Sequence, residues 1–208
     1  EKSVVQAEGD ARLAKKWRVT DTRTLPTRTY RSAWRTIAQP TDTRSLITTV
    51  LPRGSVTGNS LGLIEVQHKD EVQTENNVLV AGVNALLSSM VAEFYIRLRI
   101  AKNVNAFILK SLPAPRDLAL IEKLGRLALP LHSEDEFEKF REIDGAVVPP
   151  LVSQEERLKR IAKLDAISAD GYGLTIEEYQ SVLGSFPLVD EAFKARCLLE
   201  FKELSFKK

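Results

Sequence analysis

The stretch YRSAWRTIAQPTDTRSL, residues 30–46, combines arginines, aromatic rings, hydroxyls and amides with a single acid, Asp42. The planar guanidinium of arginine can pair with O6 and N7 of guanine or anchor a phosphate. Hydroxyl and amide side chains contact phosphate oxygens and base edges, and an aromatic ring such as Tyr30 can stack on a displaced base. The residue types therefore predict contact with nucleic acid, and the candidate contacts are Arg31, Arg35 and Arg44.

The same stretch also has a purely structural interpretation. In a β-strand, residues 30, 32 and 34 alternate with residues 31, 33 and 35, so that one face would simply belong to the core. Packing rather than base stacking is the expected role of Trp34. The arginines are harder to explain in this way, because few acids lie near them in the sequence.

Charge is distributed unevenly along the 208 residues. Residues 1–116 carry 17 Lys and Arg against 10 Asp and Glu, whereas residues 117–208 carry 13 against 18. A basic front joined to an acidic back is expected where one part of a protein meets a polyanion. Two complementary surfaces that dock on each other would produce the same asymmetry.

Catalytic motifs are missing from the sequence, which contains no GxGxxG, GxxxxGK[ST], HExxH or GxSxG. The two histidines, His68 and His132, are far apart in sequence, and each is expected on the surface. The acidic run 133–142 is interleaved with basic residues, which favours the solvated face of a helix over a metal site. A single cysteine, Cys197, excludes a disulfide framework and a Cys/His zinc site. We therefore expect no catalysis by this chain alone.

The periodicity predicts two structural regimes. Eleven threonines between residues 20 and 57 indicate a β-rich front, with short strands at 29–38, 45–51 and 61–67. Residues 76–101 have apolar positions every three or four residues, which predicts one long, largely buried helix. After the polar break KNVNA, the segment FILK is expected to form a short buried strand that ends before Pro113.

Beyond residue 116 the chain is predicted to be helical, with capping-box spacing at Ser133, Ser153 and Thr175. The expected fold class is α+β, a small β-rich recognition unit with one long buried helix followed by a helical C-terminal part. This divides the chain into a linker or tail from an upstream domain (1–16), a β/α unit (17–116) and a helical part (117–208). No apolar run is long enough to span a bilayer and no signal peptide is visible, so a cytoplasmic location is expected. The sequence does not begin with Met, so a fragment of a longer protein is expected.

Three landmarks resemble the C-terminal region of adenine-specific DNA methyltransferases from bacterial restriction–modification and phage-defence systems. The first is YRSAWRTIAQPTDTRSLITTVLPRGSVTGNSL, in which an Arg-aromatic-Arg strand precedes a T-[DN]-x-R-[ST] turn and a P-x-G loop. The second is LLSSMVAEFYIRLRIAKNVNAFILKSLPAP, and the third is LDAISADGYGLTIEEYQSVLGSFP. The resemblance spans about residues 30–187 and departs from the family at Ser88, where Asn is usual, and at Gly171, where an apolar residue is usual.

This resemblance implies a target-recognition region of the TaqI-like specificity type, which binds double-stranded DNA beside a methyltransferase domain. The family's catalytic motif [DNS]-P-P-[YFW] is missing, because VVPPLV lacks the polar residue and the aromatic, and a Gly-rich S-adenosylmethionine loop is missing too. We expect no cofactor in this chain, and S-adenosylmethionine in the catalytic domain of the parent protein. That domain would flip an adenine and methylate it, while this region would choose the target; the sequence leaves open whether the parent also cleaves DNA.

Under this hypothesis the polar loop 53–60 reads base edges, and the polar break at 102–105 forms a second edge of the interface. Arg44 and Lys102 are expected on phosphates. The residues expected at the DNA are Arg31, Arg35, Arg44, Arg53, Thr57, Asn59, Ser60, Lys102, Asn103 and Asn105.

The alternative is a protein-docking module whose basic front binds an acidic partner without touching DNA. It would be favoured if the arginines were paired with acids of the C-terminal part. A nuclease is set aside, because the sequence offers no PD-(D/E)xK arrangement.

Overall fold

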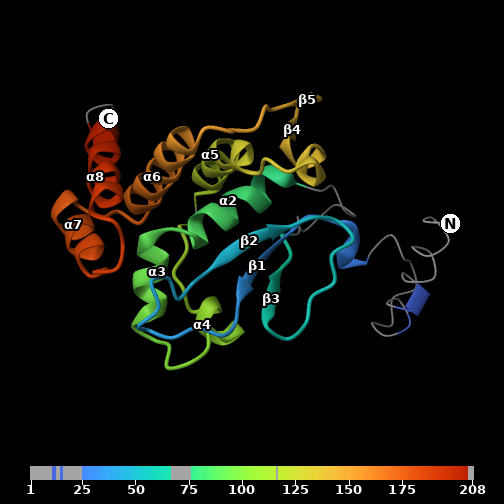
Figure 1. Cartoon of the computed structure of the whole chain (residues 1–208), viewed down its shortest axis with the longest axis horizontal. Helices are drawn as coiled ribbons and strands as arrows, with labels where there is room; N and C mark the ends of the chain where they lie inside the picture. The colour runs from blue at the N-terminus through green and yellow to red at the C-terminus, as the bar shows by residue number, and fades with distance from the viewer. Residues whose placement is uncertain (1–10, 13–14, 16–24, 67–75, 116, 206–208) are drawn as a thin grey trace.

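The computed structural model describes residues 11–12, 15, 25–66, 76–115 and 117–205. Within them the chain combines a three-stranded antiparallel sheet with a helical second half (Figure 1), which confirms the α+β class. The strands are β1 (Arg31–Arg35), β2 (Thr48–Leu51) and β3 (Leu61–Ile64), each shorter than the segment expected from the sequence.

The sheet has the order β2-β1-β3, and both outer strands are antiparallel to β1. Arg31 lies opposite Leu51 of β2, and Arg35 lies opposite Leu61 of β3. The chain therefore leaves β2 at one end of the sheet and enters β3 at the other, so residues 52–60 must cross its whole length. This connection contains the predicted recognition loop.

Alternation along β1 separates a core face from an outer face. On the core face, the hydroxyl of Ser32 donates to Oδ1 of Asn84 at 2.9 Å, and the indole N–H of Trp34 donates to the carbonyl of Val104 at 2.8 Å. Gly62 lies opposite Trp34, and a Cβ there would come within 2.1 Å of the indole. Trp34 is therefore a packing residue, as expected from the sequence.

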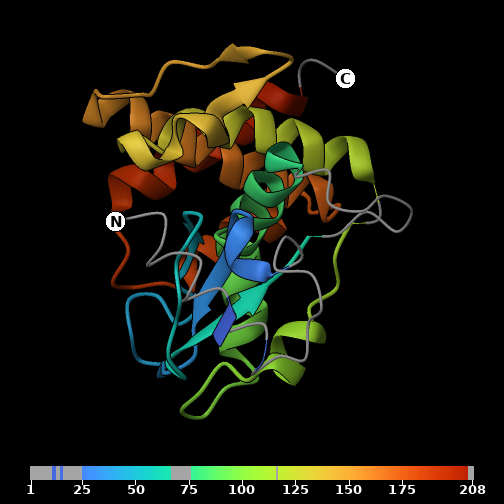
Figure 2. The ribbon, with the colours of Figure 1, turned by 90° about the vertical axis from the view of Figure 1, so that its right-hand side faces the viewer.

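Helices cover the core face of the sheet. Figures 1 and 2 show α2 running along the sheet, with the helices of the second half stacked on its other side. A short hairpin, β4 (Glu142–Ile143) and β5 (Ala146–Val147), precedes α6. The helices are α2 (Asn77–Leu87), α3 (Met90–Arg97), α4 (Ala106–Lys110), α5 (Leu118–Ala128), α6 (Gln154–Gly171), α7 (Ile176–Gly184) and α8 (Glu191–Ser205).

The prediction of one long helix over 76–101 is wrong, because α2 and α3 meet at a bend of 56°. Ser89 begins the new helix by accepting the N–H of Ala92 at 3.2 Å, and the N–H of Met90 donates to the buried carboxylate of Asp165 at 2.9 Å. Both bonds satisfy helix-end donors that a continuous helix would not expose. In the described part of the chain no single helix is long and apolar enough to cross a membrane; α2 and α3 pass that test only when taken together across their bend.

Two further expectations differ from the structure. FILK lies in helix α4 rather than in a strand, where Ile108 and Leu109 pack against the cluster around Trp34. The acidic run 133–142 forms two 3-10 turns, η4 (Asp135–Phe137) and η5 (Lys139–Arg141), rather than a capped helix, because Phe137 and Phe140 both turn into the core. The predicted caps at residues 153 and 175 are confirmed.

The predicted boundary at residues 116 and 117 does not separate two cores. One cluster joins Tyr30 and Val50 from the sheet region, α2, and residues of α5 and α6. At the crossing of α2 and α5, Cβ atoms on Gly82 and Gly125 would meet backbone carbonyl oxygens of the facing helix at 2.0 and 1.9 Å. The two halves therefore share one hydrophobic core, in which the backbones of α2 and α5 are in direct contact.

Candidate nucleic-acid interface

Arg31 was expected at the DNA, but the structure places it inside the protein, with 1% of its surface exposed. One of its terminal N–H groups donates to the carbonyl of Ser55 at 2.6 Å, and its Nε has no hydrogen-bond partner among the described residues. Burial lowers the pKa of the guanidinium, and the charge of Glu65 partly offsets that effect. Arg31 therefore holds the connection 52–60 through Ser55, and its buried guanidinium does not reach the surface where a ligand would bind.

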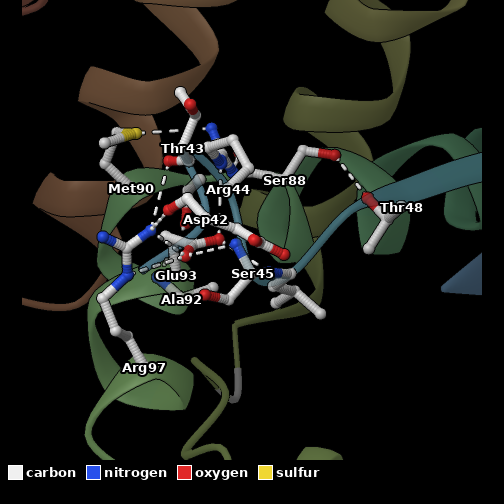
Figure 3. Close-up of polar contacts among 12 residues, drawn as sticks. Asp42, Thr43, Arg44, Ser45, Thr48, Ser88, Met90, Ala92, Glu93 and Arg97 are labelled. Atoms are coloured by element: carbon white, nitrogen blue, oxygen red, sulfur yellow. Dashed lines mark hydrogen bonds and ion pairs between the residues drawn. The ribbon is translucent and has the colours of Figure 1, made fainter. Parts of the chain in front are cut away.

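Arg44 was expected on a phosphate, and the structure gives it internal partners instead. Its Nε donates to Glu93 at 3.3 Å, and a terminal N–H donates to the carbonyl of Ser88 at 2.6 Å. Figure 3 shows Arg44 between the turn that carries it and α3. Arg44 of the T-D-T-R-S turn therefore links this turn to the junction between α2 and α3.

Glu93 is the centre of this cluster and is fully buried. The backbone N–H groups of Ser45 and Leu46 donate to its carboxylate at 2.7 and 2.8 Å, and Arg97 donates at 3.0 Å (Figure 3). A buried carboxylate is tolerated when it is paired and hydrogen-bonded in this way. The residue was not singled out from the sequence, although a lone acid in the apolar run VAEFYI is a signal of such a buried pair.

Arg35 is half-exposed and pairs with Asp42 at 2.9 Å. Asp42 also accepts the N–H of Gln39 at 3.2 Å and closes the turn after β1. The pair lies at the surface of the same end of the sheet as Thr36, so its charges largely compensate each other there. Tyr30, the other candidate for base stacking, is buried, and its hydroxyl donates to the carbonyl of Glu136 at 2.9 Å.

The connection 52–60 is exposed, as expected, and it is fastened at both ends. Near β2, the N–H of Gly54 donates to the carbonyl of Thr27 at 2.6 Å, and the guanidinium of Arg53 lies over the ring of Tyr30 at 5.0 Å. Near β3, the N–H of Leu61 donates to the carbonyl of Gly58 at 3.3 Å. Fixed ends restrict the positions that the intervening side chains can occupy.

The second polar edge is brought to the same end of the sheet by the residues that follow β1. Thr36 donates its N–H to the carbonyl of Ser60 at 2.9 Å and its hydroxyl to the carbonyl of Asn59 at 3.2 Å. The carbonyl of Thr36 accepts the N–H of Val104 at 2.8 Å, and the N–H of Ala38 donates to the carbonyl of Lys102 at 3.1 Å. The residues that extend β1 therefore join the loop 58–60 to the loop 102–104, about forty residues further along the sequence.

The side chains displayed at this end carry free hydrogen-bonding groups. We call this surface the sheet-end surface, and its members are Thr57, Asn59, Ser60, Lys102, Asn103 and Asn105. Arg53 was expected there too, but it lies at the other end of the connection, over the ring of Tyr30. All members are exposed except Thr57, which is half-buried. Within the described residues the side chains of Asn59, Lys102 and Asn103 have no hydrogen-bond partner, and Asn105 at the start of α4 makes no capping bond.

Acids are scarce around this surface. Residues 94–115 contain no Asp or Glu, and residues 25–64 contain only Asp42, which is paired with Arg35. These two segments therefore carry a net positive charge, which favours an anionic partner.

A cavity of about 610 Å³ lies elsewhere, between β2, α2 and α6. The hydroxyls of Thr48 and Ser88 share a hydrogen bond of 2.6 Å. Both residues line this cavity, as do Asp165 and His132. Burial raises the pKa of Asp165, although bonds from Tyr179 and Met90 counteract it. His132 was expected on the surface, but burial among aromatic rings lowers its pKa to about 4.

These groups do not assemble a catalytic constellation. Asp165 is occupied by the hydroxyl of Tyr179 at 2.7 Å and by the N–H of Met90, and neutral His132 has no nucleophile as partner. Within the described ranges no group of three or more His, Cys, Asp or Glu side chains could hold a metal ion.

Comparison with known proteins adds no relative from which a function could be transferred. No protein-family model, curated protein or solved structure matches this chain. The sheet-end surface and the three sequence landmarks are therefore the observations on which a functional proposal can rest.

Proposed function

We propose that this chain is a DNA-binding target-recognition module of a restriction–modification adenine DNA methyltransferase. The observation that carries the proposal is the junction at Thr36, which joins the loops 58–60 and 102–104, neither of which contains an Asp or Glu. Cations grip phosphates, and amides and hydroxyls on a firmly held loop read base edges. The sheet-end surface offers both kinds of group.

The roles divide according to position. Arg53 and Asn59 on the crossing connection are the proposed base-reading residues, and Lys102 is the proposed phosphate contact. Arg31 and Arg44 serve as internal supports, because their guanidinium groups are already engaged with Ser55 and Glu93.

The parent protein would supply the chemistry in another domain. That domain would bind S-adenosylmethionine, flip an adenine out of the duplex and methylate its amino group in the cytoplasm. The module would contact double-stranded DNA and the methyltransferase domain together, so that the choice of target and the reaction occur on one duplex.

Protein docking remains a second candidate because of one observation. The groove of about 610 Å³ beside β2 has the partly exposed apolar residues Ile47 and Ile161 in its lining. Arg35 pairs with Asp42 and Arg44 pairs with Glu93, and both acids belong to the front half. The charge pairing expected for a docked acidic tail is therefore not found for these two arginines.

Fluorescence anisotropy with a labelled random-sequence DNA duplex at two salt concentrations tests the proposal. We expect measurable binding that weakens steeply with salt, because neutralised phosphates release counterions. Lys102→Ala should weaken binding and reduce the slope of log affinity against log salt concentration by about one. The matched control is Lys123→Ala, which removes an exposed cation from α5 and should change nothing. Failure of the wild-type chain to bind at low salt would reject DNA binding and favour docking.

A further inference from the structure

Phe107 is the most exposed aromatic side chain near the sheet-end surface, with 70% of its surface accessible. It lies two residues after Asn105, in the first turn of α4. Ile37, 62% exposed, is joined to the same segment by an isolated β-bridge to Asn103. Exposed apolar patches rimmed by polar residues are typical of contact sites.

The backbone beneath Phe107 is held in place. The next two residues of α4, Ile108 and Leu109, are buried in the cluster that contains Trp34 and Val104. The segment before α4 is tied to the extension of β1 at Thr36 and Ala38. The ring is therefore presented outward by an anchored helix, which lowers the entropy lost when it meets a partner.

The charges around the ring indicate the class of partner. Lys110 lies three residues further along α4 and is also exposed, so the cation and the ring share one face of the helix. Lys102 lies on the preceding loop, and neither lysine has an acidic partner among the described residues. An apolar ring between unpaired cations suits a ligand that combines flat aromatic faces with negative charge.

We propose that the ring of Phe107 stacks on a base of the bound DNA. This inference rests on the proposed function, since it assumes that the sheet-end surface meets a duplex. Stacking on an aromatic side chain tolerates any base, because each base has a π-face. Phe107 then contributes affinity and holds a displaced or terminal base, while Arg53 and Asn59 carry the choice of sequence.

The test compares Phe107→Ala, Phe107→Trp and Phe107→Leu in anisotropy titrations with the same random-sequence duplex. We expect Ala to weaken binding by at least about fivefold, Trp to keep wild-type affinity, and Leu to fall with Ala. The slope of affinity against salt should not change, because no phosphate contact is removed. Leu199→Ala, which removes an exposed apolar group from α8, is the matched control.

The outcomes separate this inference from the proposed function. Wild-type binding that Phe107→Ala leaves unchanged would overturn the stacking role alone. Equal affinity of the Leu variant and the wild type would also overturn it, since an aliphatic group cannot stack. No binding by the wild type at low salt would overturn both. Thermal unfolding of each variant, followed by circular dichroism, shows whether a loss of binding reflects a loss of fold.

Discussion

The backbone N–H of Ser45 donates to the buried carboxylate of Glu93 at 2.7 Å, across 48 residues of sequence. Leu46 donates to the same carboxylate, and Arg44 and Arg97 approach it from both sides. One side chain of α3 therefore fixes the turn that leads from β1 into β2. The arginine of this turn is half-buried, and its guanidinium is hydrogen-bonded within the protein.

Removal of the Glu93 carboxylate should destabilise the protein strongly. Glu93→Ala leaves two backbone N–H groups and two guanidinium groups without their acceptor, so we expect the free energy of unfolding to fall by about 3–5 kcal/mol. Glu93→Gln keeps one acceptor oxygen and should cost less. Urea denaturation measures both, with Glu203→Ala, an exposed acid on α8, as control. A loss below about 1 kcal/mol for the Ala variant would show that the cluster is not a structural support.

Substitutions at the crossing of α2 and α5 should be severe although alanine is the better helix former. Gly82→Ala and Gly125→Ala would each force a Cβ against a backbone carbonyl at 2.0 or 1.9 Å. The helices must separate, so we expect a loss of at least about 2 kcal/mol in urea or thermal unfolding, despite a propensity gain of about 1 kcal/mol.

The control for this pair is Gly184→Ala at the end of α7, where a new Cβ meets nothing within 4 Å. That variant should be neutral or slightly stabilising. If Gly125→Ala were as stable as Gly184→Ala, α2 and α5 would be able to move apart without loss of stability, and their close contact would not be a structural requirement.

The local parts of the fold could be predicted from the sequence, and the non-local parts could not. Strands around residues 31–35 and 48–51 follow from β-branched composition and turn residues, and the cap at Thr175 follows from the spacing to Glu178. The helix break at Ser89 lies inside an apolar run, and Asp165 stabilises it from 75 residues away. Such a partner is invisible to any local pattern.

The candidate site shows the same limit. Exposure of Asn59 and Lys102 could be predicted because glycine-rich and polar segments lie at the surface. Their junction at Thr36 depends on strand register, and the burial of Arg31 depends on the path of residues 52–60 over the sheet. Arginines without nearby acids in sequence were therefore assigned to a ligand, although Arg44 finds its acid in α3.

Stability should decrease in mild acid in part because of His132. Burial lowers its pKa to about 4, with Glu134 opposing that effect and Arg157 and Arg141 adding to it. In the unfolded chain the pKa is about 6.5. Between these values the unfolded state binds a proton that the folded state does not, so the free energy of unfolding falls as the pH falls from about 6.5 to 4.

The measurement is urea unfolding of the wild type and His132→Phe at neutral pH and near pH 4.5. The variant keeps an aromatic ring beside Phe137 and Phe140 and has no proton to bind. Acidification should cost the wild type about 2 kcal/mol more than the variant. Parallel losses in the two proteins would mean that His132 titrates normally in the folded state.

Arg31 should hold the crossing connection in place more than it stabilises the fold. Arg31→Met keeps most of the volume of the side chain and removes a buried cation whose pKa is lowered by burial, so global stability should change by about 1 kcal/mol or less. The carbonyl of Ser55 loses its donor, which should loosen the connection around Arg53. Limited trypsin digestion after Arg53 should therefore become faster, because proteolysis follows local opening. Arg35→Met, whose lost partner Asp42 lies in a different turn, should leave cleavage at Arg53 unchanged; equal acceleration in both variants would mean that the sheet as a whole, rather than the Arg31–Ser55 bond, controls the connection.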